Sequence, residues 1–241
     1  MQDVLPRVFL ETVCVFVTPI HSHTHLTHLS YQHTHTHTGC FGAALMRVPE
    51  KLGKLALTLT QSSGMNVSVK HRIGVVDKFS EMNDMVTYEN LADFVETVHR
   101  SSQGAVKQYD VHSRCAVLNF NPKKNRAIPP IRYDYVYRLI RDFPKLRFSL
   151  NGEVCDLDDV QNHFTNGGVR EFMIGRAVQN GGPQALDNIF HPNLSSLERF
   201  ERYRNAAIQY LSSERDNTSH HVFTPLMNLF NGEKGSRQYR R

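Results

Sequence analysis

Four short segments of the 241-residue sequence carry polar side chains or glycines in an order that suits an anionic cofactor. The segments are, in chain order, Lys70 with Arg72, His112 with Arg114, Asn151 with Gly152, and Gly175 with Arg176. Ammonium and guanidinium groups bind phosphate oxygens, and a glycine lets backbone N–H groups approach a phosphate because no Cβ atom stands in the way. The pattern therefore predicts a cofactor site whose phosphate lies near the last two segments.

Each of these residues also has a purely structural explanation. Lys70 lies on the opposite face of its predicted strand from Val67 and Val69, which favours a ligand-binding role over that of a surface lysine. For His112, a ligand-binding histidine and a hydrogen-bonded core histidine stay equally open. Arg176 is a phosphate ligand or a cation at a helix end.

The elements that would position these residues alternate between strands and helices from residue 39 onward. Apolar residues alternate over 67–73, 109–112 and 146–150, and a last strand begins at Phe172. Helical spacing is shown by three groups of apolar residues: Leu91, Phe94, Val95 and Val98; Val136, Leu139, Ile140 and Phe143; Leu157, Val160 and Phe164 after a capping Asp156. The pattern predicts an α/β fold of βα units, in which ligands bind where the strands end.

The two ends of the chain differ from this region. Residues 1–38 contain half of the 14 histidines, in a His-Thr tract that we expect to be disordered or a gene-model artefact of a translated CA repeat. Metal binding by its imidazoles is the functional alternative. After about residue 190 the strands stop, and a charged stretch from Leu194 to Leu211 predicts a helical subdomain with a basic tail. We thus expect three regions: 1–38, 39–190 and 191–241.

The net charge and the cysteine content narrow the class of binding partner and the kind of cellular compartment that we expect. The formal net charge of +5 and the isoelectric point near 9.1 favour nucleic acid. Four cysteines form no CxxC pair, which argues against a zinc site and for a reducing compartment. The apolar stretch from Val8 to Ile20 is too short to span a bilayer, so we expect a soluble protein without a membrane partner. Cytoplasm and organelle stay undecided.

Several collinear motifs resemble those of tRNA-dihydrouridine synthases, and the A-type subfamily is the most similar. The motifs run over 69–74 (Val-Lys-His-Arg-Ile-Gly), 111–114 (Val-His-Ser-Arg), 121–130 (Asn-Pro-Lys-Lys-Asn-Arg-Ala-Ile-Pro-Pro) and 173–177 (Met-Ile-Gly-Arg-Ala). A C-terminal signature follows at 229–232 (Leu-Phe-Asn-Gly) and 235–241. The resemblance extends from Gly39 to Arg241.

The resemblance implies the second half of a TIM (β/α) barrel that holds flavin mononucleotide (FMN), followed by the small helical subdomain. Lys70 and His112 would lie near the isoalloxazine ring, and the phosphate end would be held by Asn151, Gly152, Gly175 and Arg176. NADPH would reduce the flavin, which passes hydride to a uracil ring, and a cysteine would protonate the neighbouring carbon. The implied tRNA contacts are Lys123, Asn125, Arg126, Arg237 and Arg240.

The sequence departs from the family pattern at two places that matter for chemistry. The Gly-Cys-Pro-Ser motif with the catalytic cysteine is absent, and Cys40 and Cys115 are weak substitutes for it. Glu153 replaces the second glycine of the usual Asn-Gly-Gly, and its carboxylate would repel a phosphate. Two hypotheses follow: a working flavin-dependent tRNA reductase, or an inactive remnant that at most binds tRNA. Half of a barrel also exposes strand edges, so we expect self-association.

Overall fold

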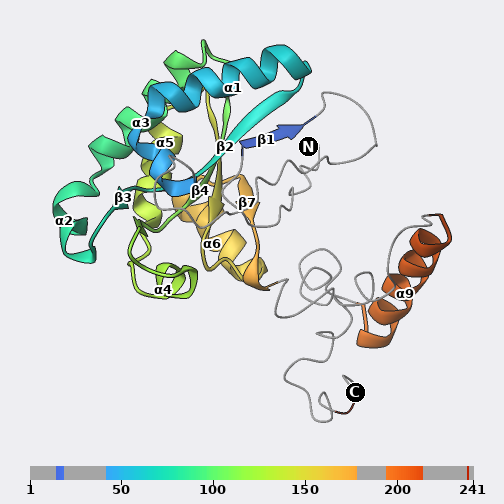
Figure 1. The fold of residues 1–241 in the computed structure, drawn as a ribbon. Coiled ribbons are helices and arrows are strands. Elements are labelled where there is room, and N and C mark those ends of the chain that lie inside the picture. Colours follow the sequence, from blue (N-terminus) through green and yellow to red (C-terminus); the bar gives the residue numbers. More distant parts are fainter. Residues whose placement is uncertain (1–14, 19–41, 178–193, 214–237, 239–241) are drawn as a thin grey trace. The chain divides into compact units, whose positions relative to one another are not determined.

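The computed structural model describes residues 15–18, 42–177, 194–213 and 238, which divide into two compact units (Figure 1). The first unit comprises Met1–Gly152 with His163–Met173, and the second comprises Glu153–Asn162 with Ile174–Arg241. Each unit is a separate body of structure. The first contains the sheet and its covering helices, and the second contains a long helix.

A five-stranded sheet in the order β1-β2-β4-β6-β7 forms the centre of the first unit. Four of its strands are parallel, namely β2 (Asn66–Arg72), β4 (Gln108–His112), β6 (Arg147–Asn151) and β7 (Glu171–Met173). They follow one another in chain order, as successive βα units do. The predicted α/β fold and all four predicted strands are therefore confirmed, and the described strands form an open sheet.

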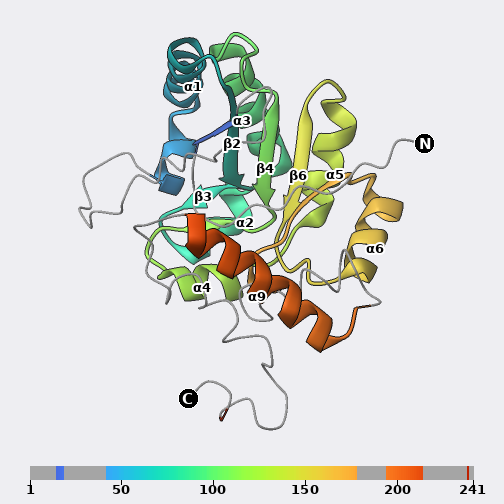
Figure 2. The ribbon, with the colours of Figure 1, turned by 90° about the vertical axis from the view of Figure 1, so that its right-hand side faces the viewer.

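Three helices, α1 (Pro49–Ser63), α3 (Tyr88–Ser101) and α5 (Tyr133–Asp142), lie on one side of this sheet (Figures 1 and 2). The predicted stripe of α3 is buried along its whole length, because its apolar residues recur at three- and four-residue spacing. On the predicted stripe of α5, Val136 and Leu139 are buried and Ile140 is half-buried. Helix α1 was not predicted, although Pro49 at its start and Gly64 at its end are helix-boundary signals.

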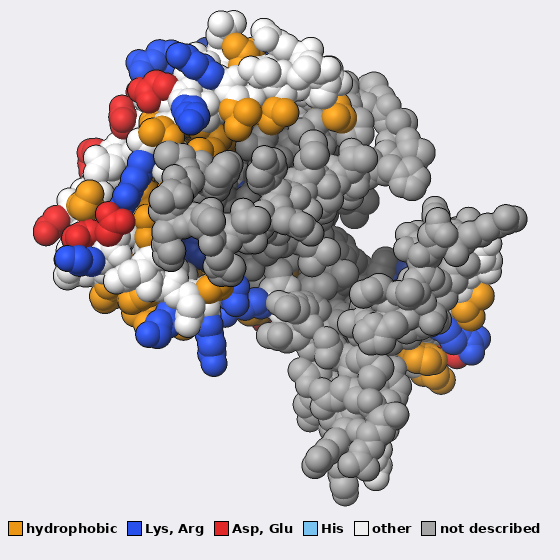
Figure 3. Space-filling model, viewed as in Figure 1, with side chains coloured by type: hydrophobic (Ala, Val, Ile, Leu, Met, Phe, Trp, Pro, Cys, Tyr) orange, Lys and Arg blue, Asp and Glu red, His pale blue; other side chains and the backbone are white. Residues whose placement is uncertain are grey.

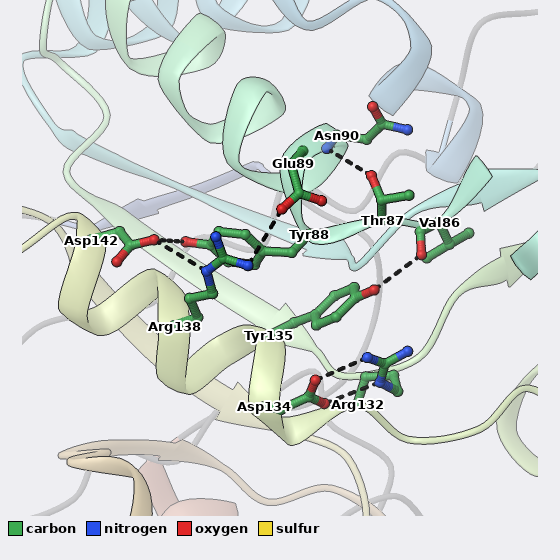
Figure 4. Close-up of polar contacts among 10 residues, drawn as sticks. All are labelled: Val86, Thr87, Tyr88, Glu89, Asn90, Arg132, Asp134, Tyr135, Arg138 and Asp142. Carbon is green, nitrogen blue, oxygen red and sulfur yellow. Dashed lines mark hydrogen bonds and ion pairs between the residues drawn. The ribbon is translucent and has the colours of Figure 1, made fainter. Parts of the chain in front are cut away.

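Polar groups join α3 to α5 at the outer surface of the helix layer (Figure 4). The Tyr88 hydroxyl donates to Asp142 at 2.6 Å, and the Arg138 guanidinium lies 3.8 Å from the centre of the Tyr88 ring. The Tyr135 hydroxyl donates to the carbonyl of Val86, just before α3, at 3.2 Å. These contacts hold α5 at its start, middle and end against the first residue of α3 and the segment just before it.

Small elements gather where the parallel strands end (Figure 2). The segment after β2 forms β3 (Val75–Val76), the short helix η2 (Phe79–Glu81) and α2 (Met82–Met85). The segment after β4 forms β5 (Ala116–Val117) and α4 (Pro122–Ala127), and β5 pairs with β3 in parallel. This second sheet ties the loop after β2 to the loop after β4, which carries the predicted RNA-contacting residues of α4.

The two remaining predicted helices are present, with one difference. In α6 (Leu157–Gly167) the Asp156 carboxylate accepts from the Asp159 N–H at 2.9 Å, which confirms the predicted cap. The predicted apolar stripe of α6 is wrong, because Phe164 is 50% exposed while His163 is buried against Tyr137. In the second unit α9 (Ser196–Ser213) confirms the predicted helix. Among the described residues, no helix combines the length and apolar character that a membrane span requires.

One strand lies within a region expected to be disordered. β1 (Val15–Thr18) pairs antiparallel with β2, so this part of residues 1–38 departs from the prediction. The physical reason is that β2 would otherwise present an unpaired edge, and Val15, Phe16 and Val17 have high strand propensity. The His-Thr tract itself lies outside the described residues.

His71 is a buried titratable group on the helix side of the sheet. Its Nδ1 lies 2.7 Å from the Arg72 carbonyl, and its ring packs against Phe94 and Tyr109 at centroid distances of 5.0 and 5.8 Å. Desolvation by burial lowers the pKa of His71 from 6.5 to about 4. The folded protein therefore holds this imidazole neutral at pH values where the unfolded chain protonates it.

This pKa predicts a loss of stability on mild acidification. As the pH falls from 6.5 towards 4, the unfolded chain binds a proton at His71 and the folded chain does not, so the free energy of unfolding should fall by up to about 3 kcal/mol. Urea denaturation at a series of pH values measures this fall. In His71→Phe the fall should be smaller by that amount, and an unchanged pH dependence would contradict the assignment.

Candidate functional site

Two rows of side chains cross the four parallel strands on the sheet face opposite α3. The register places Lys70, Asp110, Ser149 and Glu171 in one row, and Arg72, His112, Asn151 and Met173 in the next. The neighbouring residue Tyr109 points the other way, since its hydroxyl donates to the Val95 carbonyl of α3. Rows of this kind are the layers that fill the interior of a (β/α) barrel. Here most of their members are polar.

Lys70 and Asn151 meet at the ends of β2 and β6. The Lys70 ammonium donates to the Asn151 Oδ1 at 3.2 Å, and the Asn151 Nδ2 donates to the Met173 carbonyl of β7 at 2.8 Å. Lys70 is 7% exposed and Asn151 is 3% exposed. A buried ammonium beside a neutral amide is well placed to donate to an electron-rich ligand. The structure thus brings together two residues that the sequence places far apart.

Asp110 lies in the same row as Lys70, one row below Asn151, and was missed in the sequence. It accepts hydrogen bonds from Ser149, from Ser68 and from Gln108 at its two oxygens. Desolvation by burial raises the pKa of Asp110, although these hydrogen bonds and the nearby charge of Lys70 oppose the shift. The signal was present, because Asp110 shares the inward face of its strand with His112, two residues later.

His112 packs against the glycine that follows β6. Gly152 adopts a φ of +125°, and a Cβ atom there would lie 3.1 Å from the Cδ2 of His112. The Gly152 carbonyl accepts from the Tyr133 hydroxyl at 2.8 Å. The close approach and the backbone angle both require glycine at this position. His112 and Gly152 therefore belong to the same cluster as Lys70 and Asn151.

The other predicted phosphate ligands belong to the second unit. Gly175 and Arg176 follow β7 in the sequence, and Arg176 pairs with the Glu153 carboxylate at 3.5 Å. Glu153 adopts a φ of +55°, in the left-handed region that glycine favours. This angle is a physical reason for a glycine at this position in the family pattern. The Glu153 carboxylate, which was predicted to repel a phosphate, would also compete with that phosphate for the Arg176 guanidinium.

The predicted RNA-contacting residues of α4 divide into two kinds. Lys123 is exposed and Arg126 is half-buried, whereas the Asn125 side chain is engaged with the backbone of its own loop. Its Oδ1 accepts from the Val117 N–H at 2.8 Å, and its Nδ2 donates to the carbonyls of Val117 and Phe120 at 2.8 and 3.1 Å. Arg72 donates to the Asn125 carbonyl at 3.0 Å. Asn125 therefore orders the loop that presents the basic side chains.

Of the two substitute acids predicted from the sequence, the structure describes Cys115 alone. Cys115 is 1% exposed, and its thiol donates to the Ala116 carbonyl at 3.3 Å. Burial raises the pKa of this thiol from 9.0 to about 11. Both features disfavour proton donation to a bound substrate. Cys40, Arg237 and Arg240 lie outside the described residues.

Comparison with known proteins supports the resemblance seen in the motifs. The family model described as dihydrouridine synthase matches residues 32–241. The tRNA-dihydrouridine(20/20a) synthase of Salmonella typhimurium is 35% identical over 209 residues, which are 84% of this chain and 59% of the relative. The Synechocystis protein of the same name is 31% identical over 215 residues, 85% of this chain and 59% of the relative. The chain thus spans about six tenths of the length of these relatives.

The left-handed backbone at Glu153 predicts a stabilising substitution. Glu153→Gly should raise the free energy of unfolding by about 1 kcal/mol, because a Cβ atom is unfavourable at this φ and the exposed ion pair with Arg176 contributes little. Glu153→Ala is the matched control, since it removes the carboxylate and keeps the Cβ atom. Denaturation curves that show both variants equally stable would contradict the backbone argument.

Proposed function

Because the chain belongs to the dihydrouridine synthase family, we propose that it takes part in the FMN-dependent reduction of uridine to 5,6-dihydrouridine in tRNA. Its curated relatives are named tRNA-dihydrouridine synthases. The chain covers 59% of their length, so the activity, the cofactors and the tRNA partner are proposals for this chain. The observation that carries them is the buried cluster of Lys70, Asn151, His112 and Gly152 at adjacent strand ends.

This cluster fits the polar edge of a flavin ring. Lys70 is a buried donor with a neutral hydrogen-bond partner, and His112 and Asn151 occupy one row of the same sheet face. A reduced flavin carries negative charge on its ring, and a nearby ammonium stabilises that charge. When bound, FMN would supply hydride-transfer chemistry to the uracil ring, with a nicotinamide cofactor, for which we propose NADPH, as the source of the hydride. Lys70 and His112 would lie near the ring, and Asn151 would hold the flavin towards its phosphate end.

The phosphate end of the site fits FMN less well. We propose Gly152, Gly175 and Arg176 as its ligands, but Arg176 pairs with the Glu153 carboxylate within the second unit. An anion that binds Arg176 must displace this carboxylate or share the guanidinium with it. Weakened flavin binding, relative to a protein with glycine at position 153, follows from this competition.

For the tRNA, we propose contacts by Lys123 and Arg126, with Asn125 as a residue that positions them. Arg237 and Arg240 are further proposed contacts. A uridine must leave its stack to meet a flavin, so the grip on the surrounding phosphates controls access. We propose that the protein is soluble and works in a reducing compartment. Cys115 and Cys155 are free thiols, as such a compartment would keep them.

Binding without chemistry is the second candidate function. The burial of the Cys115 thiol favours it, because this substitute for the family cysteine is closed off from a bound substrate. In that case the chain would bind tRNA without reducing it. It would bind flavin as well if the cluster of Lys70, Asn151, His112 and Gly152 is able to hold the ring. The two functions differ in whether unmodified tRNA becomes reduced.

Flavin binding tests the proposal. The full chain should bind FMN, and Lys70→Met should weaken the affinity roughly 10- to 100-fold, because a charge-assisted hydrogen bond is lost while the side-chain volume is kept. Quenching of flavin fluorescence on titration with protein gives the dissociation constants. Lys145→Met, at an exposed lysine before β6, is the matched control and should bind as the unsubstituted chain does.

Incubation with unmodified tRNA, FMN and NADPH then separates the two functions. Formation of dihydrouridine supports the reductase. Flavin or salt-sensitive tRNA binding without product supports binding alone. A chain that binds neither flavin nor tRNA contradicts both.

An open strand edge predicts self-association. Within the described part of the chain, β7 pairs only with β6, so its other edge has backbone donors and acceptors available for a second copy. Sedimentation velocity should show oligomers that grow with protein concentration. A monomer that stays monomeric at high concentration would contradict this expectation.

A further inference from the structure

Two phenylalanines from different loops form an exposed stack at the end of the sheet where the site lies. Phe79 of η2 and Phe120, just before α4, have ring centroids 5.8 Å apart and planes inclined by 22°. Phe79 is 39% exposed and Phe120 is half-buried. An exposed pair of stacked rings presents an apolar face on which a flat ligand can stack. We call Phe79 and Phe120 the aromatic platform.

Basic side chains border the aromatic platform on the α4 side. The Lys124 ammonium lies 5.9 Å from the centre of the Phe120 ring, and Lys123 beside it is exposed. Around α4, Figure 3 shows Lys and Arg side chains next to hydrophobic ones on the surface. On the loop that carries Phe79, the charge of Asp77 is paired with Arg47 at 2.9 Å. The surface therefore offers positive charge at one border of an apolar ring face.

The platform is held in place by its own loops. The Asn121 side chain caps α4 by accepting from the Lys124 N–H at 2.9 Å, and Asn125 holds the Phe120 carbonyl at 3.1 Å. On the other loop, the Glu81 carboxylate accepts from the Lys78 N–H at 3.1 Å. Aromatic rings on ordered loops, with cations beside them, are the combination that proteins use to bind single-stranded nucleic acid.

We propose that the aromatic platform stacks an unpaired RNA base, while Lys123 and Lys124 hold the phosphates next to it. The choice of RNA as the ligand rests on the proposed function, and the base-stacking site extends it. The base of a nucleotide has a flat apolar face, which matches the ring face of Phe79. The phosphate backbone of the nucleotide is anionic, which matches the α4 lysines. The platform would hold a nucleotide other than the one that meets the flavin, so the platform and the flavin site can be tested separately.

The chain contains no tryptophan, so a substitution supplies a selective probe. Phe120→Trp should retain the stack, and its emission should be quenched when a 12-nucleotide oligouridylate is added. An oligomer of the same length with abasic sugars carries the same phosphates and should leave the emission unchanged. Phe164→Trp, at an exposed position on α6, is the matched control and should respond to neither oligomer.

Affinity measurements complete the test. Phe79→Ala and Phe120→Ala should each weaken oligouridylate binding about 5- to 100-fold and leave binding of the abasic oligomer unchanged. Lys124→Ala should weaken both and reduce the dependence on salt. Fluorescence anisotropy of labelled oligomers measures these changes, and circular dichroism checks the fold. If the Phe120→Ala variant does not fold, the Phe79→Ala and Phe120→Trp variants still show whether the platform stacks a base.

Three results would overturn the stacking site. They are equal losses for oligouridylate and the abasic oligomer, unchanged affinity in both alanine variants, or loss of self-association in those variants with RNA binding intact. The last result would make the platform an interface between copies of the chain. FMN titration of the same variants should match the unsubstituted chain, so failure of the flavin proposal is distinguished from failure of this one.

Discussion

The parallel register of β2, β4, β6 and β7 is the constraint on which the site depends. Backbone hydrogen bonds align Arg72 with His112, His112 with Asn151, and Asn151 with Met173, so strand ends from distant parts of the sequence form a single row. A shift of one residue in any strand would turn its polar side chains towards the helices and its apolar ones towards the cluster. The helix layer resists such a shift, because Tyr109 and its apolar neighbours are already buried there.

The rows have different chemistry, and the difference divides their roles. The upper row ends in side chains that face the ligand region, whereas Asp110 and Ser149 in the row below hydrogen-bond to each other. Lys70 shares this lower row with Asp110, whose charge acts on it, and reaches the upper row through its hydrogen bond to Asn151. A buried carboxyl group of raised pKa near a buried ammonium group also makes the charge state of the cluster sensitive to what occupies it.

Sequence patterns predicted the elements whose burial follows a simple period. α3 and α5 show their stripes, and the alternation in β2, β4 and β6 gave both the strands and the inward direction of Lys70. The failures have physical causes. In α6 a histidine is buried because Tyr137 satisfies it, and hydrophobicity alone favoured Phe164. The strands β1, β3 and β5 form because distant segments pair with one another, and no local periodicity in the sequence records such pairing. The role of Asn125 depends on which backbone groups its loop leaves unsatisfied, and this follows only from the fold.

The hydrogen bonds of Asn125 also bear on how fast the basic surface near α4 can act. Because the loop is ordered by its own amide, a polyanion meets a preformed charge pattern and freezes only a few lysine torsions on contact. Encounters are then governed by diffusion and ionic screening rather than by a folding step of the loop. The single amide of Asn125 thus spares a bound anion the entropic cost of ordering the loop that it meets.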